Sequence, residues 1–388
     1  MRDHFLFPLI ASVITFTSFL YSQSIPFDTV SIEYTSGGIR YLHLSTILPQ
    51  QIHIAEIPIG NKSLSIESIR HNGLVNTSQV VSARKKKNET VIAAVNGDFF
   101  SFSEFMPVNN QAEHGRPVTG FTTPRKSAWA LLTDGTMLFD GFTFSGSITT
   151  ASKKTYSFDR LNRNRTRSEI TLYTGYRGVS TMTDSGGVEI VLRPIAEEPS
   201  LEKPFHYIVT HASAGVNSPI PKNGAVISFG RSDTASAFLA EFTEGDTISM
   251  TMNYLPVHDR INSPIRHLLS GWGRLTWNGI NLPAIADTNE GLTAKFTAVR
   301  HPRTFVGFNA DTSMLYLGVV DGRQEQSVGM TFLEMSNFLL SYGVTNAINL
   351  DGGGSSVLVI NGKVVNSPSD KTGERPVANS IQVIVKNE

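Results

Sequence analysis

The stretch NAINLDGGGSSVLVINGKVV, residues 346–365, indicates more about the fold of this 388-residue chain than any other stretch. Residues 347–350 and 357–360 are short apolar runs, which predicts two buried strands. Asn361-Gly362 separates the second run from Val364-Val365. Because Asn-Gly favours the tight turns that join paired strands, we expect a two-residue β-hairpin here.

A helix is expected just before this stretch. Residues 331–342 carry apolar side chains at helical spacing, and Gly343 stands where a helix ends. Residues 315–320 form another apolar run that stops at Asp321-Gly322. A strand, a helix, a buried strand and a hairpin in this order predict an α+β fold. We therefore expect strand-rich mixed or antiparallel sheets with a few helices.

The remainder of the chain also favours short strands and turns. We expect β-branched strands over residues 28–70, one short helix over 77–87 capped by Thr77 or Ser78, and a buried strand from Val91 to Val95. Hairpin-like breaks are expected at the following positions: Asp134-Gly135, Ser185-Gly186-Gly187 and Glu244-Gly245-Asp246.

Three segments are predicted from this organisation. Residues 1–24 are set apart as a leader, residues 25–90 as an N-terminal strand-rich segment, and residues 91–388 as the main domain. Pro and Glu gather at 194–204, which we interpret as a surface excursion or a soft boundary.

The leader has the layout of a secretory signal peptide. A weakly cationic head, Met1 to His4, precedes a run without charge from Phe5 to Tyr21, and Ser22-Gln23-Ser24 supplies small residues for cleavage. A membrane anchor is the alternative, because the uncharged run approaches the length of a span. We expect a secreted, periplasmic or cell-surface protein with no stable membrane span after cleavage.

Composition excludes several classes of function. Lys plus Arg and Asp plus Glu number 33 each, so the chain has no net charge and no electrostatic signature of nucleic-acid binding. The cationic cluster at 84–87 is better explained as a solvated helix end. Cys is absent, which excludes thiol catalysis, thiolate zinc sites and iron–sulfur clusters. An exported protein without disulfides indicates a bacterial source.

The run Asp351-Gly352-Gly353-Gly354-Ser355-Ser356 is the strongest candidate for a functional site. Three successive glycines between two apolar strands cost backbone entropy that a plain connection would not need. They allow successive N–H groups to surround an anion, and Asp351 adds a carboxylate. The alternative is a glycine bulge in which Asp351 hydrogen-bonds within its own loop.

Other short motifs carry residues suited to an anionic ligand. Arg300 and Arg303 flank His301-Pro302 and are able to grip an oxyanion, and Asp321-Gly322-Arg323 places a charged pair at a strand end. Each motif has a structural alternative: the arginines could pair with structural carboxylates, and Asp321 and Arg323 could form a simple ion pair within a turn. Two further motifs are Asn96-Gly97-Asp98-Phe99-Phe100, which an Asx turn would also explain, and Glu374-Arg375-Pro376.

Glu334 resembles a catalytic acid by position, but a capping box is the favoured interpretation. Thr331 and Glu334 have the spacing in which the two side chains cap a helix N-terminus reciprocally. The histidines have no metal-ligand spacing, and no Ser or His stands in a nucleophile-elbow context. Only His114, before Gly115-Arg116-Pro117, is in a plausible site loop.

Taken together, the motifs resemble the phosphodiester glycosidase family, which includes the lysosomal uncovering enzyme and bacterial homologues. The resemblance is strong over about 295–385, moderate around 90–130 and thin elsewhere. The chain departs from it at Asp98, where relatives often have glycine, and at Trp272 and Arg274, which we expect to shape a different sugar pocket. The matching blocks are Asn96 to Phe100, Arg300 to Thr304 with Gly307, Asp321 to Gln324, Gly329 to Thr331, Asn349 to Ser356, and Asn366 with Arg375 to Val377.

The resemblance implies a catalytic domain over 91–388 that hydrolyses the bond between an anomeric carbon and a phosphate oxygen. It implies Asp351, then Asp321, then Glu334 as catalytic carboxylates. Arg303, Arg323 and the glycine-loop amides would hold the phosphate. The substrate-binding residues expected are Asn96, Asp98, Arg300, Arg303, Thr304, Arg323, Asn349, Gly352, Gly353, Gly354, Ser355, Ser356 and Arg375.

The expected partner is a carbohydrate or sugar-phosphate substrate, such as an envelope or exopolysaccharide glycan. No cofactor is required; calcium or magnesium bridging Asp351 or Asp321 to phosphate is the alternative that hard oxygen ligands leave open. Two other functions remain in competition: a non-catalytic carbohydrate-binding or exopolysaccharide module, and a glycosidase that acts on neutral glycans.

Overall fold

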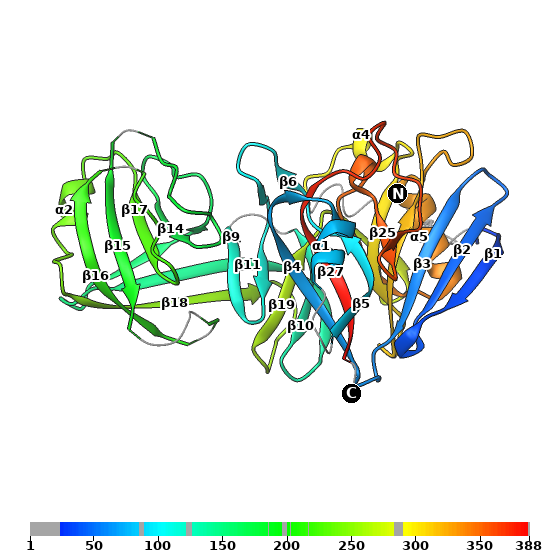
Figure 1. Cartoon of the computed structure of the whole chain (residues 1–388), viewed down its shortest axis with the longest axis horizontal. Helices are drawn as coiled ribbons and strands as arrows, with labels where there is room; N and C mark the ends of the chain where they lie inside the picture. The colour runs from blue at the N-terminus through cyan, green and yellow to red at the C-terminus, as the bar shows by residue number, and fades with distance from the viewer. Residues whose placement is uncertain are drawn as a thin grey trace, which may run out of the picture.

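The computed structural model describes residues 24–84, 89–121, 126–184, 186–195, 200–201, 203–215, 217–282 and 290–386. The predicted signal peptide lies almost entirely outside these residues. Figure 1 shows two lobes, one on the left around β14 to β18 and one on the right around β1 to β5, with the long strands β11 and β18 running from the left lobe towards the centre. Within the described residues, no helix combines the length and the apolar character needed to cross a membrane.

An eight-stranded sheet forms one wall of the right-hand lobe. One face is covered by the helix α5 (Phe332–Tyr342), whose apolar side packs against sheet residues such as Phe305 and Leu275. The strands in spatial order are β1 (Phe27–Tyr34), β2 (Arg40–Thr46), β3 (Gln51–Pro58), β23 (Met314–Val320), β22 (Arg303–Phe308), β24 (Asn346–Asn349), β20 (Arg274–Trp277) and β21 (Ile280–Asn281).

A five-stranded sheet stacks on the other face of that sheet. Ile381 and Val95 from the smaller sheet share one apolar core with Leu317 and Ile348 from the larger sheet. The short helix α1 (Thr77–Ala83) leads into this sheet. Its strands in spatial order are β26 (Lys363–Val364), β25 (Leu358–Ile360), β5 (Glu89–Asn96), β27 (Val377–Lys386) and β4 (Leu64–Val75).

A twelve-stranded sheet, called the barrel lobe here, builds the left-hand lobe and reaches the centre of the molecule, where β19 and β10 lie (Figure 1). The pairing of β10 with β11 closes the sheet onto itself around an apolar core. The strands in spatial order are β10 (Ser127–Leu132), β19 (Ile265–Ser270), β8 (Gln111–Glu113), β9 (Arg116–Phe121), β13 (Arg160–Leu161), β14 (Ile170–Thr174), β17 (Ala225–Phe229), β15 (Val188–Pro194), β16 (Phe205–Ala214), β18 (Thr247–Pro256), β11 (Met137–Thr149) and β12 (Thr155–Phe158).

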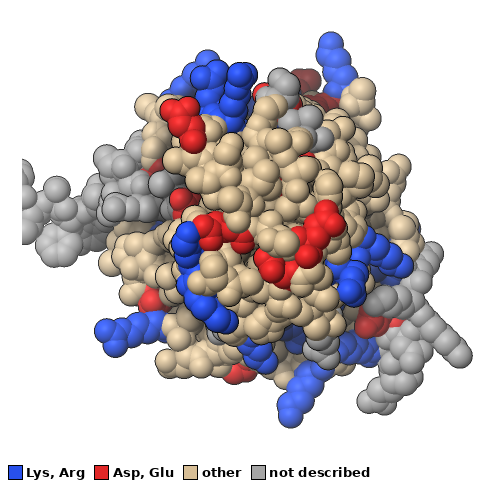
Figure 2. Space-filling view, turned by 90° about the vertical axis from the view of Figure 1, so that its left-hand side faces the viewer, with Lys and Arg blue, Asp and Glu red and all other residues tan. Residues whose placement is uncertain are grey.

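Small elements complete the chain. The outer end of the barrel lobe mixes acidic and basic side chains without one dominant sign, as Figure 2 shows for that face. The remaining elements are β6 (Phe100–Ser101) paired with β7 (Met106–Pro107), the helices α2 (Ala235–Leu239) and α4 (Ala294–Thr297), and the 3-10 turns η1 (Ser36–Gly38) and η2 (Gly353–Ser355).

The strand-rich α+β prediction is confirmed, and so are its main C-terminal elements. Helix α5 begins at the capping residue Thr331 and ends at Gly343, which has the left-handed φ of 94° that suits glycine. Strands β25 and β26 form the hairpin expected around Asn361-Gly362. The buried strand from Val91 to Val95 is β5.

Several local predictions need correction. The N-cap of helix α1 is Asn76, not Thr77 or Ser78, and the helix ends at Ala83. The Glu374 carboxylate lies at its first turn, where Oε1 accepts from the Ser78 amide at 2.9 Å. Arg84 is the helix C-cap, whereas residues 85–87 lie outside the described part of the chain.

The hairpin predictions were right once and wrong twice. Asp134-Gly135 does join the paired strands β10 and β11. Gly187 precedes β15, which pairs with β17 and β16 and not with the preceding β14. The 244–246 turn precedes β18, which pairs with β11 and β16. The 194–204 segment is the connection within the β15–β16 hairpin; residues 196–199 and 202 are not described.

The proposed boundary at residue 90 stays a prediction, but both sheets of the right-hand lobe cross it. Strand β3 pairs with β23, and β4 pairs with the last strand, β27. The N-terminal segment thus supplies strands to the same two layers as the C-terminal part of the chain.

Candidate active site

The candidate site lies where three neighbouring strands of the eight-stranded sheet meet at one edge. Strands β23 and β24 both pair antiparallel with β22, so both end where β22 begins at Arg303. Each is followed by an Asp-Gly pair, at Asp321-Gly322 and Asp351-Gly352. The topology therefore brings three of the sequence motifs to the same edge.

The glycine loop, residues 351–356, is clamped by the end of β5. The Asn96 side chain donates from Nδ2 to the Asp351 carbonyl oxygen at 2.6 Å. Its Oδ1 accepts from the Thr304 hydroxyl at 2.8 Å and from the Val357 amide at 3.1 Å. The Asp351 amide donates to the Gly97 carbonyl oxygen at 2.9 Å. Because Asn96 and Thr304 are fully buried, they position the loop from behind.

Each of the three glycines is required by a close neighbour. A Cβ at Gly352 would lie 2.7 Å from the Pro302 carbonyl oxygen. Gly353 has a left-handed φ of 63°, and a Cβ there would lie 3.1 Å from Arg323 Nη2. A Cβ at Gly354 would lie 2.3 Å from Arg375 Nη2. The glycines thus allow two guanidinium groups to lie against the loop backbone.

Most of the loop amides are already used within the protein. The Gly353 amide donates to the Pro302 carbonyl at 2.9 Å, and the Ser355 and Ser356 amides donate to Gly352 and Gly353 at 3.2 Å. These three groups are therefore not free to surround an anion as the sequence suggested. The positive groups at this site are side chains.

A pocket of about 310 Å³, called the glycine-loop pocket here, opens over the loop. It brings together the two predicted phosphate-binding arginines, the first-ranked catalytic aspartate and the three glycines. Its lining residues are Phe296, His301, Pro302, Arg303, Arg323, Asp351, Gly352, Gly353, Gly354 and Arg375.

Arg303 is a buried cation held by the backbone. It is 1% exposed, and its guanidinium lies 5.0 and 4.7 Å from the ring centroids of Phe296 and Phe332, which contact each other edge-on. Its Nε and Nη2 donate to three backbone carbonyls at 2.7–2.9 Å. Burial, followed by the charge of Arg323, lowers the pKa of Arg303 to about 9. Among the described residues no carboxylate pairs with it.

Arg323 and Arg375 differ in how far they are neutralised. Arg323 has a left-handed φ of 61°, which carries its exposed side chain towards the loop, and Nη2 lies 3.3 Å from Nδ1 of His301. Arg375 donates to Asp370 from Nε at 2.8 Å and from Nη2 at 3.0 Å. Arg323 thus keeps its charge for a ligand, whereas Arg375 shares its charge with Asp370.

The Asp351 carboxyl is half-buried at the pocket wall. Burial raises the pKa of Asp351 to about 6, against the opposing influence of the Ser355 hydroxyl and Arg375. The buried carboxyl of Asp98 has its pKa raised well above the usual range by burial and, more weakly, by the charge of Asp351. Asp98 accepts from the Asn109 side chain at 2.7 Å and from its amide at 2.9 Å. The pocket therefore presents one titratable acid near neutrality, with a second acid near it.

Comparison with known proteins shows that the pocket lies in a region similar to a known family. Residues 206–384 match the phosphodiester glycosidase family, and the whole lining of the pocket falls inside that range. The similarity to this family thus covers just under half of the chain. The mouse N-acetylglucosamine-1-phosphodiester alpha-N-acetylglucosaminidase is 38% identical over 159 residues, which are 38% of this chain and 30% of that protein. The chain therefore spans less than a third of the length of this relative.

Two solved structures share the fold over most of the chain. A hypothetical protein from Synechocystis has a TM-score of 0.74 at 21% identity, covering 94% of this chain and 64% of its own. A putative exported protein from Burkholderia pseudomallei K96243 has a TM-score of 0.70 at 21% identity, covering 88% of this chain and 74% of its own. At this identity the likeness concerns the fold alone.

Asp321, the second predicted catalytic carboxylate, faces away from the pocket. It is 3% exposed, and its oxygens accept from the Asn366 side chain at 2.9 Å, from the Ser367 amide at 3.0 and 3.1 Å, and face Nε2 of His53 at 3.2 Å. These contacts join β3 to the loop after β26. Asp321 is therefore placed as a structural acceptor.

Glu334, the third predicted carboxylate, completes the capping box of α5. Its carboxylate accepts from the Thr331 amide at 2.9 Å and from Arg300 Nε at 3.0 and 3.1 Å. Burial alone would raise the pKa of Glu334, but the hydrogen bonds from Arg300 and Thr331 outweigh it and lower the pKa. Arg300 and Glu334 thus satisfy each other, and neither lines the glycine-loop pocket.

The other predicted substrate-binding side chains lie behind the pocket wall. Asn349 is fully buried and donates to the Trp272 and Leu350 carbonyls, while its Oδ1 has no partner among the described residues. Ser356 is 1% exposed, and its hydroxyl oxygen lies 3.2 Å from the Thr304 hydroxyl oxygen. These residues shape the loop without reaching the pocket surface.

Trp272 and Arg274 have different surroundings. Trp272 contacts Phe99 edge-on, and Phe99 in turn contacts the pocket residue Phe296, so a row of aromatic rings connects Trp272 to the pocket wall. Arg274 is buried over Trp277, 3.4 Å from its ring centroid, and donates to the Phe139 carbonyl. Only Trp272 is thus placed to influence a ligand.

Sequence reasoning did not find Phe296 or Asp370. Phe296 lies in the one-turn helix α4, its carbonyl accepts from Arg303, and no motif marks it. Asp370 lies in the loop between β26 and β27 and pairs with Arg375. The one signal for Asp370 in the sequence is that it is a carboxylate only five residues before Arg375.

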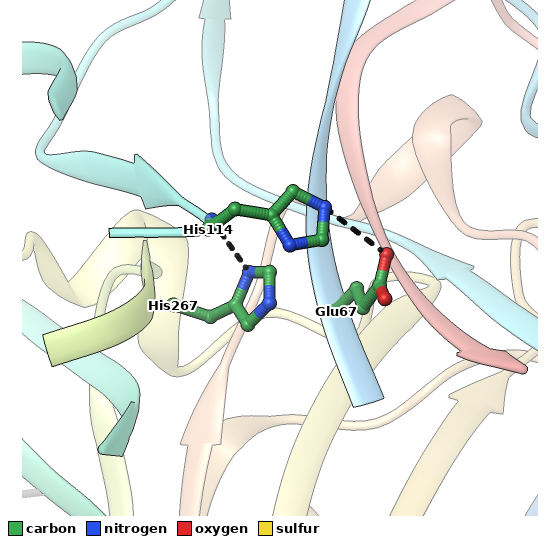
Figure 3. Close-up of side chains that lie close together, drawn as sticks. All are labelled: Glu67, His114 and His267. Atoms are coloured by element: carbon green, nitrogen blue, oxygen red, sulfur yellow. Dashed lines mark hydrogen bonds and ion pairs between the residues drawn. The ribbon is translucent and has the colours of Figure 1, made fainter. Parts of the chain in front are cut away.

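A separate group of residues offers metal-ligand atoms, away from the pocket. Glu67, His114 and His267 each place one such atom within 4.8 Å of the others, and Figure 3 shows both imidazoles beside the carboxylate. His114 Nε2 lies 3.4 Å from Glu67 Oε2. Two nitrogens and one carboxylate suit zinc better than calcium or magnesium.

The surroundings of this group do not fit a metal. The guanidinium of Arg84 already contacts the same Glu67 oxygen. The amides of Ser68 and His114 donate to Nδ1 of His267 at 3.3 and 3.5 Å. Nδ1 is therefore the acceptor, and the imidazole proton is assigned to Nε2. Neither nitrogen then has a lone pair to give to a metal. We interpret Glu67 as an anionic hub that joins β4, α1 and the barrel lobe.

Proposed function

We propose that this protein is an exported hydrolase that cleaves the bond between an anomeric carbon and a phosphate oxygen in a sugar 1-phosphodiester, such as one in an envelope or exopolysaccharide glycan. The single observation that carries the proposal is the convergence of Arg303, Arg323 and Asp351 on one pocket inside the family-matched region. The name of the mouse relative, which specifies a 1-phosphodiester, supports the class of substrate.

The charge balance of the glycine-loop pocket suits an anion. Arg303 and Arg323 have no carboxylate partner in the described part of the chain, and Asp351 supplies one negative charge when ionised. Burial and the two arginines lower the pKa of His301, so its imidazole is neutral at pH 7. A phosphodiester, with one negative charge, would accept hydrogen bonds from Arg323 and from Nη1 of Arg303, the guanidinium nitrogen of this pocket residue that donates to no described group.

Asp351 is the proposed base. Its pKa of about 6 leaves the carboxylate mostly ionised at pH 7 and still basic enough to take a proton from water. The oxygen of that water bonds to the anomeric carbon as the bond between that carbon and the phosphate oxygen breaks. The electron pair of that bond leaves with the phosphate, which departs as a monoester. The guanidinium groups stabilise the charge that accumulates on it.

The decisive experiment compares matched substrates. Purified mature protein is incubated with a sugar 1-phosphodiester and with the neutral methyl glycoside of the same sugar, and free sugar is quantified. We expect release from the phosphodiester at least 100-fold faster than from the glycoside. Equal release would instead indicate a neutral-glycan glycosidase. Binding of both without release would indicate a carbohydrate-binding module.

Two matched variants separate the roles in that assay. Asp351→Asn keeps the shape of the side chain and should abolish most turnover of the phosphodiester. Arg323→Gln should weaken binding of the phosphodiester and leave any slow hydrolysis of the neutral glycoside unchanged. A variant Asp351→Asn with wild-type turnover would refute the assignment of Asp351.

Export and metal independence belong to the same proposal. We expect cleavage after residue 24, which the mass of the mature protein recovered from a secreting host would reveal. Because Asp321 is saturated by protein donors and Asp351 faces arginines, we propose that no metal is required. Turnover that falls after treatment with EDTA and returns with calcium or magnesium would contradict this.

A further inference from the structure

A pocket of about 420 Å³ lies at the outer end of the barrel lobe. Its walls come from β12, the start of β14, the end of β17 and the helix α2, and it is called the outer-end pocket here. Figure 1 shows α2 at the far left of the molecule and β25, which follows the glycine loop, in the right-hand lobe. The outer-end pocket is therefore remote from the glycine-loop pocket. Its size is within the range of small-ligand pockets, roughly 300–1,000 Å³.

The sheet topology explains how this pocket forms. Ile170, the first residue of β14, is paired with Phe229, the last residue of β17, so these two strand ends lie side by side. Helix α2 packs against them through Phe238, whose ring centroid lies 5.1 Å from that of Phe229. Tyr156 of β12 contacts Phe238 edge-on, with 5.0 Å between the ring centroids. These four side chains give the pocket an apolar wall that is fixed by packing.

The charged groups of the outer-end pocket leave one carboxylate without a partner. Lys154 pairs with Glu241. Glu169 pairs with Arg160, which is not one of the lining residues. The exposed side chain of Asp159 has no hydrogen bond or ion pair in the described part of the chain. Among the described lining residues, the pocket thus carries one unpaired negative charge and no unpaired cation.

Hydroxyl groups stand beside this carboxylate in the pocket lining. Ser157 and Ser168 are exposed, and neither hydroxyl has a partner within the described ranges. The Thr234 hydroxyl lies 3.1 Å from the Ser232 hydroxyl, which leaves it capacity for one further hydrogen bond. Because a hydroxyl both donates and accepts, these groups match the hydroxyls of a sugar.

We propose that the outer-end pocket binds an amino sugar, a pyranose that carries a protonated amine. The ammonium would pair with Asp159, since a hydrogen bond between opposite charges is roughly twice as strong as a neutral one. The C–H face of the ring would pack on Tyr156, and Ser157 and Ser168 would meet its hydroxyls. An acidic sugar is disfavoured, because each cation at the pocket is already paired with a carboxylate.

This site does not depend on the proposed hydrolysis at Asp351. It would give the protein a second point of attachment to a glycan, through a sugar unit other than the one that is cleaved.

The test uses three probes that share one ring and differ in charge: glucosamine, glucose and glucuronic acid. Each is titrated into the full-length mature protein at about pH 6, where the sugar amine is protonated, and followed by saturation-transfer NMR. We expect glucosamine to bind about tenfold more tightly than glucose, the gain for one hydrogen bond to a charged group, and glucuronic acid to bind most weakly. Equal binding of glucosamine and glucose, or tightest binding of glucuronic acid, would overturn the proposal.

A charge variant assigns the amine to Asp159. Asp159→Asn should weaken glucosamine by about tenfold and leave glucose unchanged, because it removes the charge and keeps the shape of the side chain. Asp184→Asn is the matched control, since Asp184 is also exposed in the barrel lobe but does not line the pocket. The same loss in both variants would indicate a general attraction to an acidic surface and would overturn the proposal.

A steric variant tests the pocket without removing any polar group. Ala237 of α2 is exposed and lines the pocket, so Ala237→Trp should fill it and weaken glucosamine by about tenfold or more. The neighbouring Ser236 is exposed on the same helix and does not line the pocket, so Ser236→Trp should have no effect. Unchanged binding in a folded Ala237→Trp would overturn the proposal.

Asp351→Asn is the control in the glycine-loop pocket. It should leave the binding of glucosamine unchanged, whether or not the protein hydrolyses phosphodiesters. Loss of binding in Asp351→Asn with none in Asp159→Asn would assign the probe to the glycine-loop pocket and overturn the proposal. Failure of the proposed hydrolysis, with glucosamine binding that still depends on Asp159, would support this site and refute only the proposed function.

Discussion

The loops after β23 and β24 begin with the same two residue types and use them in opposite ways. After β23, Asp321 points inward to protein donors, and Arg323 turns out to the pocket through a left-handed backbone. After β24, Asp351 lies at the pocket wall, and most of the loop amides donate within the protein. An Asp at a strand end is thus structural or functional according to how many donors its neighbours supply.

The largest expected effect separates the two aspartates. Asp351→Asn should lower kcat by about 10²–10⁴-fold, the range for a lost general base, with little loss of stability. Asp321→Asn should instead lower the free energy of unfolding by about 2–4 kcal/mol, because it leaves buried donors unpaired. Turnover of a phosphodiester and thermal unfolding of both variants provide the check. A folded but inactive Asp321→Asn would reverse the comparison.

Arg323 and Arg303 should differ in the same way, the first affecting substrate binding and the second affecting stability. Arg323→Ala removes an exposed cation over Gly353 and should raise KM by about 10–100-fold, as expected for a charge-assisted hydrogen bond. Arg303→Ala leaves three backbone carbonyls without donors and should cost about 3 kcal/mol or more of stability.

Arg303→Lys is the matched control, since lysine keeps the charge without the planar fork. We expect it to remain destabilised in urea unfolding, whereas Arg323→Lys should recover part of the affinity. If both lysine variants behaved alike, the structural role of Arg303 would be wrong.

The pH dependence should report Asp351. With a folded pKa of about 6, ionised Asp351 increases from pH 5 to pH 7, so kcat/KM should rise over that interval. Stability should move in the other direction. The folded pKa exceeds the ordinary value of 3.8, so the folded state binds more protons, and stability falls as pH rises from about 4 to about 6.

Asp351→Asn removes that dependence. Relative to wild type, the variant should gain up to about 3 kcal/mol between pH 4 and pH 7, which chemical denaturation at several pH values would measure. A difference that does not change with pH would show that the carboxyl titrates with an unshifted pKa.

The smallest effect is expected at the capping box. Thr331→Ala should cost about 1 kcal/mol of stability and leave KM and kcat unchanged, because Glu334 and Arg300 satisfy each other away from the pocket. Thermal unfolding with a parallel activity assay decides this. A loss of kcat without a loss of stability would return Glu334 to the list of catalytic candidates.

The parts that could be predicted from sequence are those governed by local rules. Thr331, Glu334 and Gly343 mark both ends of α5 through capping chemistry, and Asn361-Gly362 marks a hairpin through its turn preference. The convergence of Arg303, Arg323 and Asp351 was expected from the family resemblance, and it is found.

The parts that failed depend on contacts between distant segments. Gly187 and Gly245 resemble hairpin turns, but β15 and β18 do not pair with the strands that come just before them in sequence. The roles of Asp321 and the loop amides were decided by Ser367, His53 and Pro302. No local pattern reveals such partners.

The position of β27 has a consequence for how the chain reaches its folded state. This last strand lies between β5 and β4, roughly three hundred residues away from both in sequence. Closing so large a loop is slow, and neither neighbour has its full set of partners until residues 377–386 arrive. Until then the two open strand edges are ready templates for another chain, so the interval before β27 docks is when this protein is most exposed to self-association.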